Sequence, residues 1–165
     1  LGCATANVGK DYVPNSVLNR GLLIFSMSVV VEDNYFQHLR LGIRSTDGGG
    51  KYIVELLGHS LRANAEWDSP TGRLVYLELP QGKYELYGWQ YWPNHECCLP
   101  LKAPREFTVI EGRATYIGNI HFTVSPRSEA YKFEIRDMSE RDIPLLMSRL
   151  PNLEPSQVNS EILEQ

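Results

Sequence analysis

The sequence predicts a mainly β protein, an antiparallel β-sandwich of seven to nine strands followed by a short helical C-terminal tail. Two observations carry this prediction. Up to Asp137, turn-forming residues separate segments in which apolar and polar residues alternate, a period typical of half-buried strands. After Asp137 the apolar residues recur at helical spacing. We therefore expect a tether over residues 1–20, a sandwich over 21–137, and a tail over 138–165 that packs on the sandwich.

Composition and charge exclude some classes of protein. A chain of 165 residues can form one domain with a hydrophobic core. Hydrophobic residues make up 42% and charged residues 22%, which is ordinary for a globular protein. The formal net charge of -4 provides no basic field for nucleic acid. No stretch approaches the roughly 20 apolar residues of a membrane-spanning helix.

The first residues, Leu1-Gly2-Cys3-Ala4, resemble the end of a bacterial lipobox, in which a small residue precedes the cysteine that becomes lipidated. The alternative is an incidental cysteine. Ala4 to Asn19 has no hydrophobic period and contains Gly9 and Pro14, so we expect a mobile tether. The resemblance implies a lipid on Cys3. Because no aspartate follows Cys3, it also implies the periplasmic face of the outer membrane.

Alternation predicts the first strands at Gly21–Val31, Tyr35–Ser45 and Lys51–Gly58. The glycine-rich segment Thr46–Gly50 is expected to be a hairpin loop, since no GK[ST] ending or helix follows to make a phosphate loop. The irregular segment His59–Gly72 is expected to cross from one sheet to the other.

The stretch Arg73–Trp92 is expected to form a hairpin at the centre of the sandwich, because Pro80-Gln81-Gly82 has the composition of a tight turn. A second hairpin is expected from Arg105–Ile110 and Arg113–Val124, with Gly118 marking a bulge or a close backbone approach. A strand at Tyr131–Asp137 closes the β region.

The helical tail is predicted to begin at Asp142-Ile143-Pro144, where a capping residue precedes a proline. Its apolar stripe is too short to persist as a free helix, so it must dock on an apolar surface. The stripe consists of Leu145, Leu146, Met147, Leu150 and Leu153. Pro155 is expected to open a second short helix.

Three aromatic residues, Tyr87, Trp89 and Tyr91, alternate along the predicted central strand and therefore share a face. Such a face could bind a sugar or a peptide. It could equally belong to the core or receive the C-terminal helices, which is the interpretation we favour.

Residues with reactive or metal-binding side chains do not form a recognisable catalytic pattern. His95, Glu96, Cys97 and Cys98 are four possible metal ligands, but adjacent side chains point apart and rarely converge on one metal. Thiol redox chemistry is a similarly minor alternative. The favoured interpretation is a surface loop with a local disulfide or free thiols. Ser26 and Ser28 lack a nucleophile motif, and His38, His59 and His121 are scattered. Asp137, Glu140, Arg141 and Asp142 are expected to be caps and surface pairs. We predict no enzyme activity, cofactor or metal site.

The segment Leu79-Pro80-Gln81-Gly82-Lys83-Tyr84 resembles the LPxGxY hairpin of prealbumin-like and carboxypeptidase-regulatory-like sandwiches, in which the tyrosine braces the turn. Phe107–Val109 and Tyr116–Ile120 resemble a later hairpin of small bacterial lipoproteins with that fold. The resemblance implies a lipid-anchored envelope protein that acts as an interaction or scaffolding module with an envelope protein partner. The alternative is a small-ligand or glycan binder that uses the aromatic face.

Overall fold

The computed structural model describes residues 7–14, 18–31, 38–57, 64–68, 70–91, 99–125 and 130–163. In chain order its elements are β1 (Arg20–Val31), β2 (His38–Ser45), β3 (Lys51–Leu57), β4 (Trp67–Asp68), β5 (Thr71–Pro80), β6 (Gly82–Tyr91), β7 (Leu99–Val109), β8 (Ala114–Ser125), β9 (Ala130–Arg136), α1 (Ser139–Arg149), the 3₁₀ turn η3 (Pro155–Gln157) and β10 (Val158–Ser160). Within these ranges, no helix is both long and apolar enough to span a bilayer.

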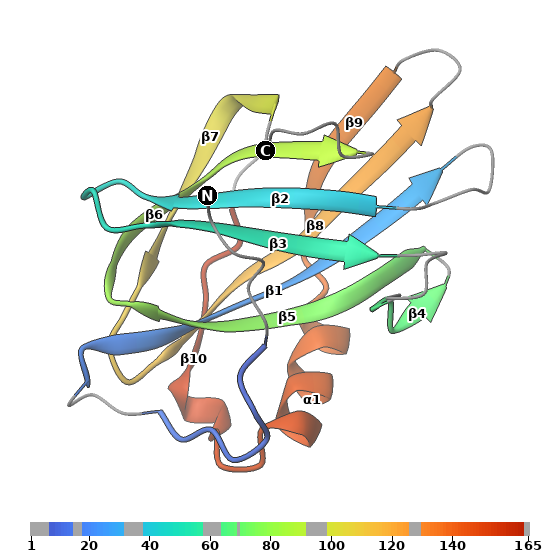
Figure 1. Cartoon of the computed structure of the whole chain (residues 1–165). Helices are drawn as coiled ribbons and strands as arrows, with labels where there is room; N and C mark the ends of the chain where they lie inside the picture. The colour runs from blue at the N-terminus through green and yellow to red at the C-terminus, as the bar shows by residue number, and fades with distance from the viewer. Residues whose placement is uncertain are drawn as a thin grey trace.

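The strands form two sheets that face each other (Figure 1). One sheet has the order β3-β2-β6-β7. The other has the order β10-β8-β1-β5-β4, and β9 also pairs with β8. The predicted class, a mainly β sandwich with a short helix, is confirmed. The described residues contain ten strands, and the short β4 and β10 take the number above the predicted range.

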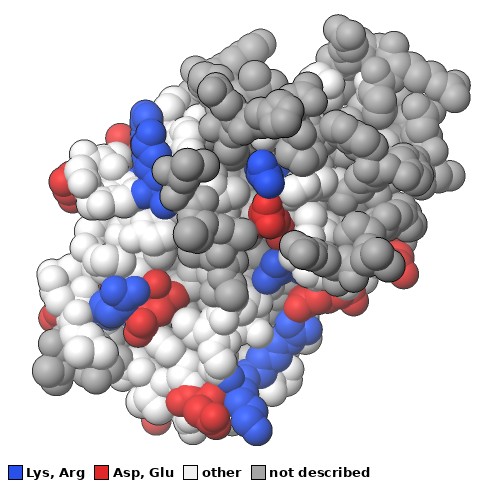
Figure 2. Space-filling view, viewed as in Figure 1, with Lys and Arg blue, Asp and Glu red and all other residues white. Residues whose placement is uncertain are grey.

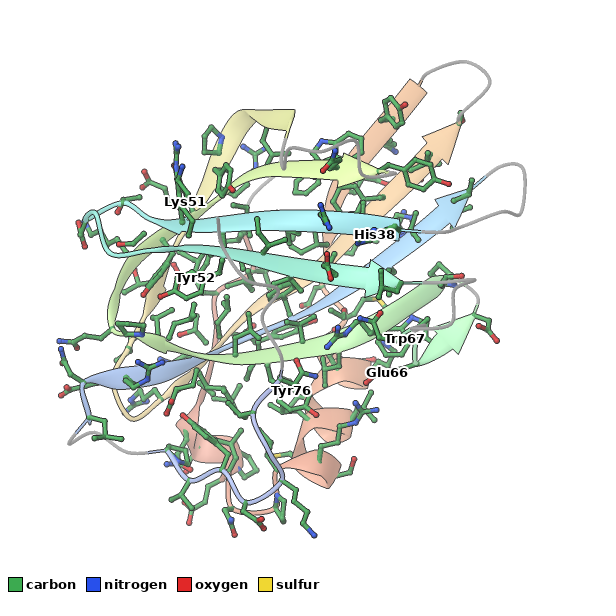
Figure 3. The ribbon with its side chains drawn as sticks, viewed as in Figure 1. His38, Lys51, Tyr52, Glu66, Trp67 and Tyr76 are labelled. Atoms are coloured by element: carbon green, nitrogen blue, oxygen red, sulfur yellow. The ribbon has the colours of Figure 1, made fainter. Side chains whose placement is uncertain are left out.

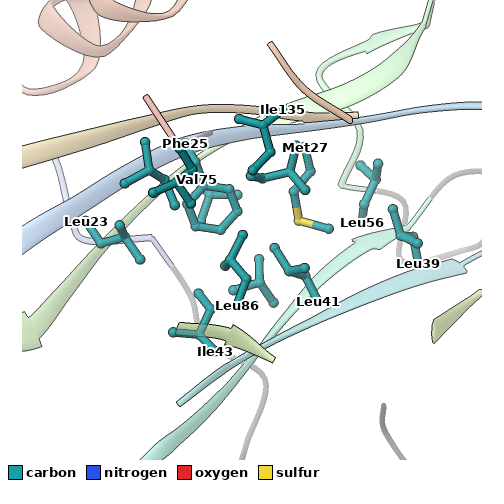
Figure 4. Packing of buried hydrophobic residues seen from close by; sticks show 14 of the residues in the cluster. Leu23, Phe25, Met27, Leu39, Leu41, Ile43, Leu56, Val75, Leu86 and Ile135 are labelled. Carbon is teal, nitrogen blue, oxygen red and sulfur yellow. The ribbon is translucent and has the colours of Figure 1, made fainter. Parts of the chain in front are cut away.

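The core lies between the sheets, where the inward side chains of both sheets meet (Figure 4). Leu23, Phe25 and Met27 of β1 face Leu39 and Leu41 of β2 across this layer, and all five are fully buried. Their spacing of two residues is the alternation found in the sequence, because successive side chains of a strand point to opposite faces.

The predicted central hairpin is wrong, because its two arms lie in different sheets. Strand β5 pairs with β1, whereas β6 pairs with β2 and β7. The segment around Gln81 is therefore a corner between the sheets, and the Gln81 N–H donates to the Asn19 carbonyl. The later expected hairpin fails in the same way, since β7 and β8 also belong to different sheets. The hairpin of β2 and β3 is confirmed.

The tyrosine after the corner braces it, as the LPxGxY resemblance implies. Tyr84 is 2% exposed, and its hydroxyl donates to the Pro80 carbonyl over 2.8 Å. Gly82 has a φ of +150°, a conformation that side chains with a Cβ rarely adopt.

We expect Gly82→Val to lower the free energy of unfolding by about 1–3 kcal/mol, because valine would strain the backbone at this corner. The neighbouring atoms leave room for a Cβ, so the effect isolates conformation from packing. Urea denaturation measures it, with Gly9→Val as the control because nothing lies within 4 Å of a Cβ there. Equal stability of the two variants would contradict this account of the corner.

Gly118 marks a bulge in β8, as predicted. Its φ is +102°, and the register of β8 against β1 shifts by one residue between Tyr116 and Asn119. A Cβ at Gly118 would lie 3.0 Å from the Arg136 carbonyl oxygen. The bulge separates two halves of one edge of β8: β10 pairs with the first half and β9 with the second.

From Asn7 to Tyr12 the N-terminal segment contacts the sandwich, where we expected a tether without such contacts. The Val8 N–H donates to the Tyr76 carbonyl, and both Val8 and Tyr12 pack on an apolar cluster of the sandwich. The sequence shows no period here because only isolated side chains make contact.

The C-terminal segment packs on the sandwich, but on a different surface from the one predicted. Helix α1 lies against the outer face of the larger sheet, where Leu146, Leu150 and Leu153 join a buried cluster (Figure 1). The sheet contributes Leu22, Ile24, Leu74, Tyr76, Ala114 and Tyr116 to this cluster. The expected second helix is only the turn η3, after which β10 pairs in parallel with β8.

Candidate functional site

The structure separates the three aromatic residues that alternation places on one face. Gly42 of β2 pairs with Gly88, and Ile43 pairs with Leu86, so Tyr87 is an extra residue in β6. This bulge reverses the alternation. Trp89 and Tyr91 consequently pack against the inner core, whereas Tyr87 lies on the outer face. The Trp89 ring contacts Phe122 and Tyr131 at centroid distances of 5.4 and 5.1 Å.

On the outer face of the smaller sheet, the phenol end of Tyr87 lies close to Gly42, and two cations lie over its ring. A Cβ on Gly42 would stand 2.6 Å from the Tyr87 ring, so only glycine accommodates this position. The Arg44 Cζ and the Lys51 Nζ lie 5.2 and 6.0 Å from the ring centroid. Burial raises the pKa of Tyr87, and Arg44 opposes that rise. We call Gly42, Arg44, Lys51 and Tyr87 the Tyr87 platform.

The platform belongs to a row of charges that crosses the sheet. In register order the row is Lys51, Arg44, Glu85 and Glu106, with both cations at one end and both carboxylates at the other. Arg44 Nε forms an ion pair with Glu85. Figure 2 shows basic atoms on this face at the end where Figure 3 labels Lys51.

A second charged group on the same face lies along β2 and β3. Glu55 accepts hydrogen bonds from Arg40 Nε at 2.8 Å, and its carboxylate lies 3.2 Å from His38 Nε2. Burial lowers the pKa of His38, while Glu55 acts in the opposite direction. This group is satisfied within the chain, whereas Lys51 is exposed at the sheet edge.

The largest group of hydrogen-bonded polar side chains is instead buried beneath α1. The Asp142 carboxylate is fully buried and accepts hydrogen bonds from Ser26 Oγ at 2.6 Å, Tyr116 OH at 2.8 Å and Arg141 Nε at 2.7 Å. The Arg141 guanidinium also lies over the Trp67 ring, 4.6 Å from its centroid. Burial and the Asp142 charge raise the pKa of Tyr116, so its hydroxyl stays a donor.

Asp142 is thus neither a cap nor a surface residue, contrary to the prediction. Helix α1 begins at Ser139, three residues earlier than Asp142, whose side chain points into the sheet. The helical spacing of Asp142, Leu146 and Leu150 is the signal that was missed, because residues four apart share one helix face.

The network extends from Ser26 to a histidine through donors that all point one way. Asn119 Nδ2 donates to Ser26, and Ser28 Oγ donates to Asn119 Oδ1 at 2.9 Å. Because the single hydroxyl proton of Ser28 is used there, His121 Nδ1, 2.8 Å away, must carry a proton and donate to Ser28. Each donated proton therefore points towards the Asp142 carboxylate.

Hydrogen-bond donation from His121 towards Asp142 runs in the wrong direction for nucleophilic catalysis. A catalytic histidine must accept the proton of the serine, but His121 donates to Ser28. Ser26, Ser28 and His121 are also no more than 3% exposed, so substrate has no access to them. At its Asp142 end, the network links α1 to the sheet through Ser26 and Tyr116.

The burial of His121 predicts a loss of stability in acid. Burial, followed by the charge of Arg136, lowers its pKa from 6.5 to about 4. The unfolded chain therefore binds the proton more tightly, so stability is complete above about pH 6.5 and falls as the pH drops towards 4. We expect His121 to contribute about 2–3 kcal/mol to this loss.

Urea denaturation between pH 7 and pH 4 measures this contribution. The variant His121→Gln should flatten the decline, since glutamine does not titrate. If native protein and variant lose stability equally over this range, His121 is not the responsible group.

Other predicted site residues lie outside the described ranges. These are Cys3, His59, His95, Glu96, Cys97 and Cys98. Among the described residues, no group of three or more potential metal ligands comes together. A hollow of about 450 Å³ beside the start of α1 is lined by Asp137, Met138, Ser139, Glu140 and Arg141.

Comparison with known proteins does not identify a function for this chain. No family model and no curated protein matches the chain. A leucine-rich repeat protein from Bacteroides thetaiotaomicron is one solved structure that is similar, with 15% identity and a TM-score of 0.36. The match covers 70% of this chain and 14% of that chain. A likeness at this level carries no argument about fold family or activity.

Proposed function

We propose that this protein is a non-catalytic interaction module of the bacterial cell envelope, which binds a partner protein through the Tyr87 platform. One observation carries the proposal: the Tyr87 ring lies on the outer face of a sheet with the Arg44 and Lys51 cations over it, whereas Ser26, Ser28, His121 and Asp142 are buried. The partner that fits is a protein surface with an acidic side chain opposite Lys51 and Arg44.

The platform has properties of a binding surface. Arg44 keeps 45% of its side chain exposed although it pairs with Glu85, so a partner can reach part of this side chain. Arginine and tyrosine are enriched in the energetic centres of interfaces. The separated charges of the row would orient the partner, since charge complementarity contributes more to specificity than to affinity.

Affinity capture from native membranes tests the proposal with a matched set of variants. The double variant Lys51→Glu with Tyr87→Ala should lose a partner that the native protein recovers. Lys132→Glu is the control, because it makes the same charge change on the other sheet. Equal recovery by all three proteins would reject the platform as the binding surface.

The envelope location is a separate part of the proposal and depends on the lipobox resemblance at Cys3. Expressed in a bacterium with a lipoprotein signal peptide, native protein should fractionate with the outer membrane. Cys3→Ser should release it into the periplasmic fraction. Retention of the variant on membranes would mean that another element anchors it.

The resemblance to prealbumin-like and carboxypeptidase-regulatory-like domains supports a binding role, and the Tyr84 brace is consistent with it. A glycan-binding role is the alternative. It rests on Tyr87 alone, because Trp89 and Tyr91 pack on the core. Binding of soluble oligosaccharides that Tyr87→Ala abolishes would favour this alternative.

A further inference from the structure

Two asparagine side chains occupy the outer edges of two strands in the same way. At β5, Asn7 Oδ1 accepts from the Tyr76 N–H at 2.9 Å, and Asn7 Nδ2 donates to the Leu74 carbonyl at 3.1 Å. The next backbone N–H, that of Val8, donates to the Tyr76 carbonyl at 3.1 Å. One side-chain amide thus bonds the N–H of one residue and the carbonyl two positions before it.

The same three bonds recur at β3. Asn64 Oδ1 accepts from the Leu57 N–H at 2.6 Å, and Asn64 Nδ2 donates to the Glu55 carbonyl at 3.0 Å. The next backbone N–H, that of Ala65, donates to the Leu57 carbonyl at 3.3 Å, and the Asn64 N–H adds a further bond to the same carbonyl at 3.0 Å. These are the groups that a neighbouring strand would bond, because N–H and C=O groups of alternate residues point away from the edge.

Charged side chains form hydrogen bonds with further backbone groups on these two edges. Glu66 Oε2 accepts from the Leu74 N–H at 2.8 Å, and the Arg20 guanidinium donates to the Glu78 carbonyl at 3.1 Å. Arg73, on β5, donates to the Glu55 carbonyl of β3 at 3.0 Å and so links the two edges. Figure 3 labels Glu66 and Tyr76, which mark the outer edge of β5.

We propose that Asn7 and Asn64 are edge clamps, which occupy the backbone groups that a strand of a second copy of this chain would need and so suppress edge-to-edge self-association. An unprotected edge strand is a template for pairing with another chain. The apolar residues of β3 and β5 make such pairing favourable once the edge opens. This inference does not depend on the proposed function, which uses the face of the smaller sheet.

Light scattering over a dilution series tests the proposal on the full chain. We expect Asn7→Ala with Asn64→Ala to self-associate at a concentration at least about tenfold below that of the native protein. Asn7→Asp with Asn64→Asp should act in the same direction, because each keeps the acceptor oxygen and turns a second oxygen towards a carbonyl. Asn159→Ala is the control, because the Asn159 side chain accepts from an arginine side chain.

Destabilisation alone could also cause association, so a second control is needed. Ile43→Val loosens the core without touching either edge. The two variants are compared under conditions in which each has lost the same number of degrees of melting temperature relative to the native protein. If Ile43→Val then associates as readily as the double alanine variant, the clamps are not the cause and the proposal fails. It also fails if the double variant associates like the native protein.

Hydrogen exchange gives an independent readout at the clamps themselves. The amide protons of Leu57 and Tyr76 should exchange faster in the alanine variants than in Asn159→Ala, while those in β1 keep their protection. Unchanged protection at Leu57 and Tyr76 would show that the asparagines do not hold these groups, and would overturn the proposal.

Discussion

Truncating Leu146 of α1 together with Leu150, the residue that follows the helix, should unfold a large fraction of the protein. Leu146 and Leu150 are fully buried between the helix and the outer face of the larger sheet. Each leucine-to-alanine change in such a site costs about 2–5 kcal/mol, so Leu146→Ala with Leu150→Ala removes on the order of 4–10 kcal/mol. That is comparable with the whole stability of a typical domain. Urea denaturation monitored by circular dichroism measures the loss.

The control is Ser148→Ala, which changes an exposed position of the same helix. Hydrogen exchange on the native protein adds a test that requires no variant. The amides from Ile143 to Leu150 should be protected, because the packed helix must open before they exchange. Rapid exchange there would mean that α1 is loose in the isolated protein and is better explained as a segment that binds a partner.

Asp142→Ala should be the most damaging single change of a polar residue. It leaves the Ser26 and Tyr116 hydroxyls and the Arg141 guanidinium without their shared acceptor. Each buried donor left without an acceptor costs about 1–3 kcal/mol, and the Ser26 and Tyr116 hydroxyls are both fully buried, so the loss should be several kcal/mol. Thermal and urea denaturation should both show the effect.

Two further variants separate charge from packing at this position. Asp142→Asn keeps the size and one acceptor oxygen, so its loss should be smaller than that of Asp142→Ala. Glu140→Gln, on the exposed side of α1, should be nearly neutral. If Asp142→Ala is as stable as Glu140→Gln, the buried network does not hold the helix on the sheet.

Alternation along the chain located most of the long strands, although β7 begins at Leu99, six residues before the strand predicted at Arg105. The predicted Gly21–Val31 and Lys51–Gly58 correspond closely to β1 and β3, because the strand face that meets the core needs an apolar residue at every second position. Alternation did not reveal which strands pair. The corner at Gln81 and a hairpin turn have the same local composition, and β5 and β6 are separated by the core, which forms from residues far apart in sequence.

The candidate site also combines a feature that the sequence predicted with features that only strand pairing produced. Tyr87 was identified as an aromatic candidate, but a period of two cannot reveal a bulge, and the bulge alone moves Tyr87 to the outer face beside Arg44 and Lys51. Those two cations come from the hairpin of β2 and β3 and meet Tyr87 only through strand pairing.

The sequence by itself determined the class of fold, the positions of the long strands and the apolar stripe of the tail, since these follow from local periodicity. Only the tertiary structure decided where that stripe docks, how Asp142 becomes buried and which edges Asn7 and Asn64 close. The physical reason is that each of these depends on contacts between residues distant along the chain. A polar residue such as Asn7 or Asp142 carries no sign of its partner until the sheet brings Tyr76 or Ser26 beside it.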